Sequence, residues 1–383
     1  MEHTTRVLLQ LFLMFGVAKL LGEIFERIRQ PAVIGEIFAG ILLGPYVLKI
    51  VSPSELTTGI AEIGVIILLF TVGLETKPSD LMQVGRRAML VAVLGVVLPF
   101  FGGYLYMRVI AHSNLESIFI GTALVATSVG ITARVLADMG ILNTAVARVI
   151  LGAAVIDDIL GMILLAIVSA LSAGHVSYVS LGLVVGEAVA FTLVVVFWGS
   201  RVVGRITPRI NRAYSRNPAF IISLLACLGL SVAASYIGMA AIIGAFLAGL
   251  AIADHREAWN ITESTQALYE FLVPFFFVVM GAQLNLKIFL DKNIIVTALL
   301  ISLVAILTKL VGCGLGAIRM GFRDAVRIGF GMVPRGEVGI IVALLGLRLH
   351  AISDAVYSIV VVMTIITTLV APPVLRALFK GVQ

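Results

Sequence analysis

The chain has 383 residues, of which 60% are hydrophobic and only 13% are charged. Soluble globular domains carry about 25% charged residues, so this composition excludes an ordinary soluble protein and indicates a polytopic membrane protein. The formal net charge of +6 would indicate nucleic acid or anionic lipid as a partner only if the basic residues gathered in a patch.

The apolar segments, taken in chain order, predict an all-α membrane protein with about thirteen transmembrane helices. The first segment lacks a small-residue cleavage site and is too long for a signal peptide, so we interpret it as a retained helix. The expected spans are 6–25, 32–50, 59–75, 87–110, 116–139, 146–172, 178–203, 217–237, 238–254, 265–284, 293–318, 325–348 and 353–378.

The basic residues indicate the orientation of the chain. Most of the 27 Lys and Arg residues, Arg134 among them, fall on the side that the chain reaches after odd-numbered helices. Because basic residues favour the cytoplasmic side, we expect an inner-membrane protein with its N-terminus outside and its C-terminus in the cytoplasm. The same loops account for the positive charge, so the bilayer is the expected partner and nucleic acid is not.

The two halves of the sequence share a short repeat. AVIG at 32–35 recurs as AIIG at 241–244, and VGI at 129–131 recurs at 338–340, both 209 residues later. The matched helices, two with nine and five with twelve, cross the membrane in opposite directions. Inverted repeats are typical of secondary transporters with alternating access. Chance similarity between small-residue packing motifs is the alternative.

Helices five and twelve are weakly helical at their centres. Helix five carries Thr127 and Ser128 there, and helix twelve carries the sequence PRGE, which includes Arg335 and Glu337. Proline and glycine weaken a helix, and unwound backbone at membrane depth is tolerated only where it is buried or lines a cavity. Arg335 and Glu337 would then neutralise the facing ends of half-helices. A pair of ordinary kinked helices is the alternative.

Asp157 and Asp158 lie side by side near the middle of helix six, within LGAAVIDDILGMILL. Each charge at that depth costs roughly 2.5–3.5 kcal/mol, so the pair needs a reason. Lys309 lies near the middle of helix eleven, and an aspartate of helix six is its natural partner. Consecutive helical residues point about 100° apart. We therefore expect one aspartate to pair with Lys309 while the other faces a water-filled cavity.

These groups can serve a small cation. An ionised aspartate, the hydroxyls of Thr127 and Ser128 and the free carbonyls of an unwound helix five offer the oxygen ligands that hard cations prefer. Cation and proton would then compete for one carboxylate, which is the minimal chemistry of an antiporter.

The remaining ionisable residues are less informative. We interpret Glu36, Glu62, Glu75 and Glu187 as structural or interfacial. The five His are scattered near helix ends and the two Cys fall in apolar runs, which argues against a disulfide or metal framework. We expect no cofactor, and the sequence offers no nucleophile or cofactor motif for a membrane enzyme.

Taken together, the paired aspartates, Lys309 and the PRGEVG stretch resemble the bacterial monovalent cation:proton antiporter superfamily. The chain is most similar to the NapA-like sodium/proton antiporters and more distantly to the potassium-efflux Kef proteins. The resemblance covers essentially the whole chain, through QPAVIGEIFAGILLGP (30–45), LLFTVGLE (68–75), GTALVATSVGITARVL (121–136), LGAAVIDDILG (151–161) and VPRGEVGIIVA (333–343).

The resemblance implies a homodimer in which a dimerisation scaffold flanks a core built around two crossed, broken helices. The domains it implies are scaffold helices in 1–85, core helices in 86–172, a linker helix in 173–216, scaffold helices in 217–292 and core helices in 293–383. Movement of the core against the scaffold would then give an elevator-type transport cycle.

The resemblance also implies roles for single residues. Asp158 matches the principal ion- and proton-binding aspartate, where Na+ would bind, and Asp157 matches the aspartate that pairs with the lysine, here Lys309. Thr127 and Ser128 match positions beside the ion site.

Glu337 matches an acid near the helix crossing, and two aspartates together with a lysine resemble electrogenic sodium/proton exchangers. We therefore expect exchange of Na+ or Li+ for H+, in the service of pH homeostasis.

A Kef-type K+/H+ antiporter is an alternative, weakened because only a few residues follow the last helix and leave no room for a nucleotide-binding domain. A channel or a sodium-coupled solute symporter is the other alternative, although a symporter would need a larger polar cavity.

Overall fold

The computed structural model describes residues 3–28, 30–52, 54–76, 78–110, 113–172, 178–210, 217–283 and 292–380. Within these ranges every regular element is a helix, and nine of the described helices are long and apolar enough to cross a membrane. Two shorter apolar helices, Ala32–Leu43 and Val338–Leu347, add to them. The predicted all-α, multi-pass architecture is confirmed, while the count of thirteen spans stays a prediction.

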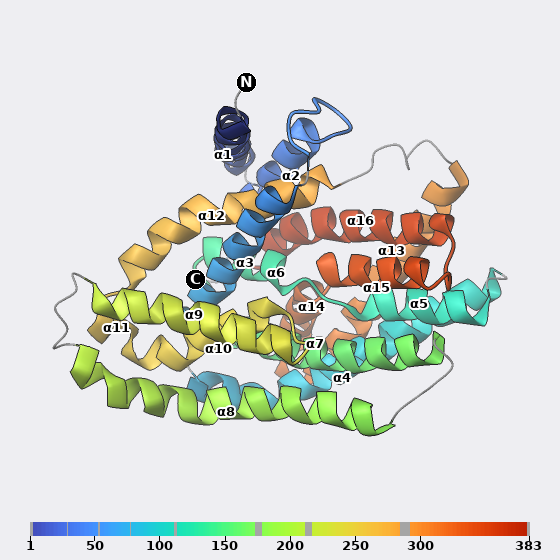
Figure 1. Cartoon of the computed structure of the whole chain (residues 1–383). Coiled ribbons are helices and arrows are strands. Elements are labelled where there is room, and N and C mark those ends of the chain that lie inside the picture. Colours follow the sequence, from blue (N-terminus) through green and yellow to red (C-terminus); the bar gives the residue numbers. More distant parts are fainter. Residues whose placement is uncertain are drawn as a thin grey trace.

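The helices fall into two halves joined by α8 (Tyr178–Ile210), which lies along one edge of the molecule (Figure 1). The first half contains α1 (His3–Arg27), α2 (Ala32–Leu43), α3 (Glu55–Glu75), α4 (Pro78–Val109), α5 (Asn114–Val125), α6 (Val129–Asp138) and α7 (Ala145–Ser172). The second half contains α9 (Pro218–Tyr236), α10 (Ala241–Ile252), the 3-10 turn η1 (Ala253–His255), α11 (Arg256–Trp259), α12 (Thr262–Ala282), α13 (Lys292–Ala317), the 3-10 turn η3 (Ile318–Met320), α14 (Phe322–Gly331), α15 (Glu337–Arg348) and α16 (Asp354–Leu378).

The packing of the first half recurs in the second. α1 packs against α2 as α9 packs against α10, and α4 packs against α5 and α7 as α13 packs against α14 and α16. α2 and α10 coincide when the sequence is shifted by the 209 residues of the repeat. Both halves also contain a broken helix, α5 with α6 and α14 with α15. The structural repeat predicted from two short motifs is therefore confirmed.

The predicted end of the second helix is wrong. The hydropathy extended this helix to residue 50, whereas α2 ends at Leu43. Gly44 precedes a proline, and a residue in that position is disfavoured in helical geometry. Gly44 also packs closely on α12, because a Cβ atom there would lie 3.1 Å from the Cα of Ala282. The apolar residues that follow form a turn in which Lys49 has a φ of 57°.

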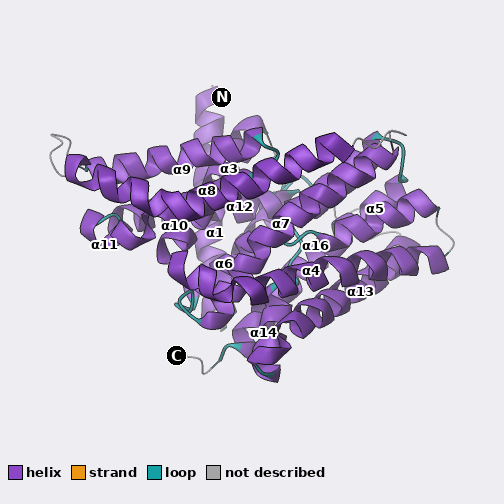
Figure 2. Cartoon of the chain, turned by 90° about the horizontal axis from the view of Figure 1, so that it is seen from below, coloured by secondary structure: helices purple, strands orange, loops and turns teal. Residues whose placement is uncertain are grey.

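Close helix contacts organise the molecule into two groups. In one group α3 packs against α10 and α12, and α2 packs against α12. In the other, α4 packs along α13, and glycine allows the close approach, since a Cβ atom on Gly312 would lie 2.5 Å from the carbonyl oxygen of Leu94. α6 lies near the centre of the molecule (Figure 1 and Figure 2) and contacts α2 and α3 as well as α7 and α16.

Candidate ion-binding site

The two broken helices cross at their unwound segments. The backbone N–H of Ser128, between α5 and α6, donates to the carbonyl of Pro334, between α14 and α15, at 2.8 Å. Gly336 allows this approach, because a Cβ atom there would lie 2.5 Å from Ser128 Oγ. Proline supplies no N–H of its own to the helix and thereby contributes to the break. The unwound centres predicted for these helices are confirmed.

Side chains satisfy the open end of α14. The last carbonyls of a helix have no partner within it. Met332 O accepts Arg335 Nη1 at 3.1 Å and Thr127 Oγ1 at 3.4 Å, and Gly331 O accepts Thr132 Oγ1 at 2.6 Å. Arg335 is fully buried, and its Nη2 also donates to Ala305 O at 3.4 Å. Its guanidinium thus lies at the end of α14 where the helix dipole is negative, and its role in neutralising that dipole stays a prediction.

Lys309 joins α13 to three other helices, α4, α5 and α7, beside this crossing. Its Nζ donates to Asp157 Oδ1 at 2.9 Å, to Gly95 O at 2.8 Å and to Val125 O at 2.9 Å. The ammonium group has three N–H donors, so all of them are used. Lys309 is 0% exposed, and Asp157 is 3% exposed. The resemblance implies the contact with Asp157, whereas no signal in the sequence pointed to the two carbonyls.

Asp158 has a different environment from its neighbour. Asp157 is buried against Lys309, whereas Asp158 is partly exposed. The two residues follow each other on α7, and the rotation of about 100° per residue separates their directions. Asp157 is therefore locked in an ion pair, whereas Asp158 is partly exposed as a residue, although its Oδ2 atom is buried.

The structure links the predicted residues through the break in α5. Val125, at the end of α5, accepts from Lys309, and two residues later Thr127 contacts the end of α14. Ser128 follows at the crossing, buried, and its Oγ has no hydrogen-bond partner among the described residues. Glu337 begins α15, but its side chain lies outside the described residues.

Arg134 is not a loop residue, although we counted it with the basic residues of the cytoplasmic side. It lies on α6 and is only 7% exposed. Its Nη2 lies 3.6 Å from Glu36 Oε1 on α2, and its Nε donates to Asp138 Oδ2 at 3.0 Å. The one available signal was Asp138, since an acid four residues from a base on a helix indicates a pair.

A cavity of about 440 Å³ reaches the crossing from one face of the molecule. It lies between α2, α3, α9, α10 and α12 on one side and α15 and α16 on the other. Its lining is mostly apolar, with polar groups from Thr58, Glu62, Gln283, Thr364 and Thr368, and it extends to Gly336.

The site is built from oxygen atoms of carboxylates, hydroxyls and main-chain carbonyls. No cluster of three or more His, Cys, Asp or Glu that could hold a metal ion occurs in the part of the chain that the structure describes. Such a set of hard oxygen donors suits a small cation that passes through the protein.

Known proteins are similar to this chain in sequence and in fold. The family described as "Sodium/hydrogen exchanger, transmembrane" matches residues 12–381. The high-affinity Na+/H+ antiporter NhaS3 of Synechocystis is 35% identical, over 98% of this chain and 90% of the relative. The Na+/H+-K+ antiporter GerN of Bacillus cereus is also 35% identical, over 97% of this chain and 95% of the relative. The structure of the sodium proton antiporter MjNhaP1 from Methanocaldococcus jannaschii superposes with a TM-score of 0.72 at 20% identity, over 100% of this chain and 97% of that one, which is a similarity of fold.

The repeated halves and the crossed, broken helices define a membrane transporter rather than an enzyme. The chain belongs to the sodium/hydrogen exchanger family, within the monovalent cation:proton antiporters. The resemblance drawn from the sequence is thereby confirmed.

Proposed function

We propose that the protein exchanges Na+ or Li+ for H+ across the cell membrane, with cation and proton competing for Asp158. The observation that carries this proposal is the different environment of the two aspartates on α7: Asp157 forms an ion pair with Lys309, while Asp158 is partly exposed. Asp158 lies outside the ion pair that Lys309 makes with Asp157, so it can exchange cation and proton, whereas a carboxylate in a buried ion pair cannot do so without losing its partner. The printed functions of relatives at 35% identity support the same exchange.

Thr127 and Ser128 would complete the oxygen ligands of the cation. Ser128 Oγ is buried and makes no hydrogen bond within the described ranges, so its lone pairs are available. Thr127 Oγ1 donates its hydrogen to Met332 O, which leaves its own lone pairs free to accept a cation. Na+ would thus be held at Asp158 by one charged and two neutral ligands.

Lys309 would make the exchange electrogenic. If Asp158 and Lys309 each take up a proton when one Na+ leaves, two positive charges move against one. Asp157 would then act as the switchable partner of Lys309, since the salt bridge can form only when Lys309 is protonated. The contact at 2.9 Å would thus correspond to the protonated form.

The transport cycle would be an elevator-type movement of two rigid groups in a homodimer. The core would comprise 86–172 and 293–383, the scaffold 1–85 and 217–292, and 173–216 would link them. Close packing of α4 on α13 and of α3 on α10 and α12 supports two internally rigid groups. With the N-terminus outside and the C-terminus in the cytoplasm, the cavity would open to the outside.

Exchange in proteoliposomes with an imposed pH gradient tests the proposal. Added Na+ or Li+ should dissipate the gradient in the wild type, and Asp158→Asn should reduce this exchange to background because Asn cannot carry a proton. Glu187→Gln on α8, an exposed acid outside the site, is the matched control and should retain exchange. Exchange in Asp158→Asn at the wild-type rate would refute the assigned site.

K+/H+ exchange is the second candidate, because the printed function of one relative includes K+. Replacing Na+ by K+ in the same vesicles separates the two activities. A sodium-coupled symporter is less well supported, since the mostly apolar cavity lining offers few groups to an organic solute. Solute uptake driven by Na+ without proton countermovement would favour it.

A further inference from the structure

Arg134 connects the two groups of helices through a single buried side chain. From α6 its Nη2 lies 3.6 Å from Glu36 Oε1 on α2, and its guanidinium carbon lies 4.8 Å from the centre of the Tyr269 ring on α12. All three residues are less than 10% exposed. In the proposed transport cycle α6 belongs to the core, whereas α2 and α12 belong to the scaffold. The contact therefore crosses the boundary at which the movement would occur.

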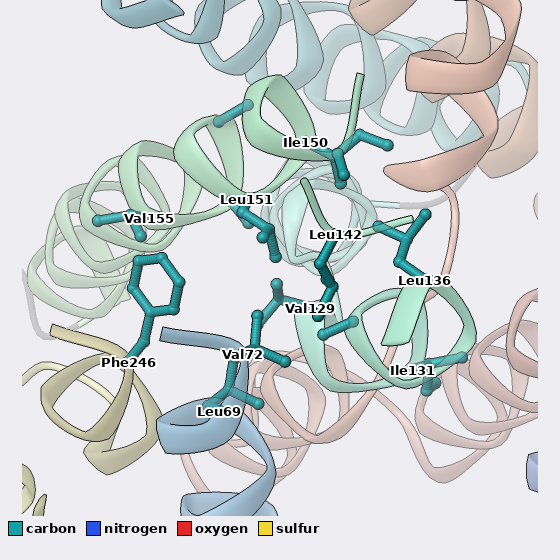
Figure 3. Close-up of a cluster of buried hydrophobic side chains, with 14 of the residues drawn as sticks. Leu69, Val72, Val129, Ile131, Leu136, Leu142, Ile150, Leu151, Val155 and Phe246 are labelled. Carbon is teal, nitrogen blue, oxygen red and sulfur yellow. The ribbon is translucent and has the colours of Figure 1, made fainter. Parts of the chain in front are cut away.

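Tyr269 and both chain neighbours of Arg134, Ala133 and Val135, belong to a large apolar cluster. Leu69 and Val72 of α3 face Val129 of α6, and Phe246 of α10 faces Val155 of α7 (Figure 3). Apolar side chains from both groups therefore meet here and exclude water.

The cavity lies nearer the start of α3 than Leu69 and Val72 do, and it shares Ile37 and Val65 with the apolar cluster. Along α3 it is lined from Thr58 to Ile66, and at Val65 the chain of α6 comes into contact, since a Cβ atom on Gly130 would lie 3.4 Å from Val65 Cγ2. Arg134 is six residues beyond Ser128, roughly 9 Å along the helix at 1.5 Å per residue. The crossing is therefore reached from the face where α3 begins, the open face, and sealed from the face where α3 ends, the closed face.

The ion pair between Arg134 and Glu36, here called the bridge, has a long N–O distance for a buried pair. Charge-assisted hydrogen bonds measure about 2.7–2.9 Å, and the separation here is 3.6 Å. Glu36 Oε2 and Arg134 Nη1 are buried and have no hydrogen-bond partner among the described residues. A permanent buried pair is stable only when such atoms are satisfied. This contact is therefore less well satisfied than a permanent buried pair.

Asp138 allows Arg134 to leave the scaffold without losing its charge partner. It lies four residues further on α6, and its Oδ2 accepts from Arg134 Nε at 3.0 Å. Because both residues belong to the same helix, they would move together. Only the contacts with Glu36 and Tyr269 would break.

We propose that Arg134 is a positioning residue that holds the closed face of the transport pathway shut by bridging α6 to Glu36 and Tyr269, and that this bridge opens once in each transport cycle. The inference rests on the proposed alternating-access function. It predicts that weakening the bridge shifts the resting protein toward the state that is open at the other face.

Sided labelling of a cysteine at the crossing tests the proposal without measuring transport. Val338→Cys serves as the reporter, because Val338 lies two residues beyond Gly336, lines the cavity and is half-buried, whereas the two native cysteines, Cys227 and Cys313, are buried. The probe is a membrane-impermeant maleimide, applied to right-side-out and to inside-out vesicles. Glu36→Gln is the test variant, and Asp138→Asn is the matched control because it removes a carboxylate that contacts the same arginine from the same helix.

Glu36→Gln should raise the labelling rate from the closed face about tenfold, within the usual range of conformational couplings, and lower it from the open face. Asp138→Asn should raise neither rate, because it leaves Arg134 with Glu36. Tyr269→Leu, which removes the aromatic face, is a second test variant and should shift labelling in the direction of Glu36→Gln.

Unchanged labelling in both Glu36→Gln and Tyr269→Leu would overturn the proposal, and so would an equal rise in Asp138→Asn. If these variants leave labelling unchanged while Asp158→Asn abolishes exchange, the bridge is refuted and the proposed function stands. If labelling shifts as expected while Asp158→Asn still exchanges ions, the bridge stands and the assigned ion site fails.

Discussion

Lys309 and Asp157 form an ion pair from which the protein excludes water. Such pairs are expensive to break from one side, because the remaining charge is left buried without a partner. Replacing both partners together removes both charges, and the cost then falls. The difference in cost between single and double replacement therefore tests whether the pair of Lys309 and Asp157 serves stability or transport.

A double-mutant cycle at Lys309 and Asp157 measures that asymmetry. Lys309→Gln or Asp157→Asn alone should lower stability by about 3–5 kcal/mol, and the double variant should recover most of the loss. Thermal unfolding of the purified protein is the measurement. Lys309→Gln should still yield folded protein whose exchange has an altered pH dependence; complete loss of folded protein in Lys309→Gln would instead mark the pair as a structural salt bridge.

The proposed competition at Asp158 would fix the sign of the pH dependence. A proton and Na+ cannot occupy the carboxylate together, so lowering the pH should raise the KM for Na+. Where the carboxyl is mostly protonated, the rise should approach about tenfold per pH unit if one proton competes. Initial exchange rates over a Na+ series at several pH values provide the test. A KM that stays constant across the active pH range would contradict a shared site.

At the scale of elements, the crossing of the broken helices depends on Gly336. A Cβ atom at this position would lie 2.5 Å from Ser128 Oγ and 2.6 Å from Ser128 Cβ. Gly336→Ala should therefore push the unwound segments apart and reduce exchange at least tenfold while the helices stay folded. Gly161→Ala on α7, where a Cβ atom has nothing within 4 Å, is the matched control and should keep its exchange.

Exchange assays and circular dichroism of the two glycine variants give the measurement. Ser128→Gly should restore part of the exchange lost in Gly336→Ala, because it removes both atoms that the new methyl group would meet. Wild-type exchange in Gly336→Ala would show that the crossing tolerates a wider separation.

The sequence predicted those features of the helices that depend on a particular residue type at a particular position. Proline and glycine mark the break before α15, and a lysine at membrane depth implies an acidic partner. The main-chain carbonyls of Gly95 and Val125, which accept hydrogen bonds from Lys309, could not be predicted, because every residue has a carbonyl group. Arg134 was misplaced since hydropathy places a base near a helix end at the surface, whereas tertiary contacts with Glu36 and Tyr269 bury it.

At the scale of the whole molecule, two similar halves of the chain form two groups of closely packed helices, and the groups meet at a boundary. Two short motifs sufficed to predict the repeat, because each half folds into the same set of contacts. The boundary between the groups could not be predicted in the same way. The contacts of α6 with α2 and α3 join segments far apart in the chain, and their apolar residues resemble those of any buried helix.

Cross-linking across this boundary tests the movement of the whole molecule. Val65 on α3 and Gly130 on α6 are in contact across it, near the spacing that a disulfide needs. Oxidation of Val65→Cys with Gly130→Cys should fix α6 to α3 and reduce Na+/H+ exchange to background, because an elevator-type cycle requires these helices to slide. Reduction of the disulfide should restore the exchange.

The matched control is a cross-link inside the proposed scaffold. A Cβ atom on Gly22 of α1 would lie 3.5 Å from the Cβ atom of Ala32 on α2, a spacing that suits a disulfide. Gly22→Cys with Ala32→Cys therefore joins two helices that should not move against each other. This disulfide should leave exchange within about twofold of the reduced protein, since it constrains no motion of the cycle. If the pair across the boundary also leaves exchange intact after complete oxidation, α6 and α3 do not slide, and the two-body movement is excluded. If the scaffold pair blocks exchange as strongly, the dividing line between the moving groups lies elsewhere.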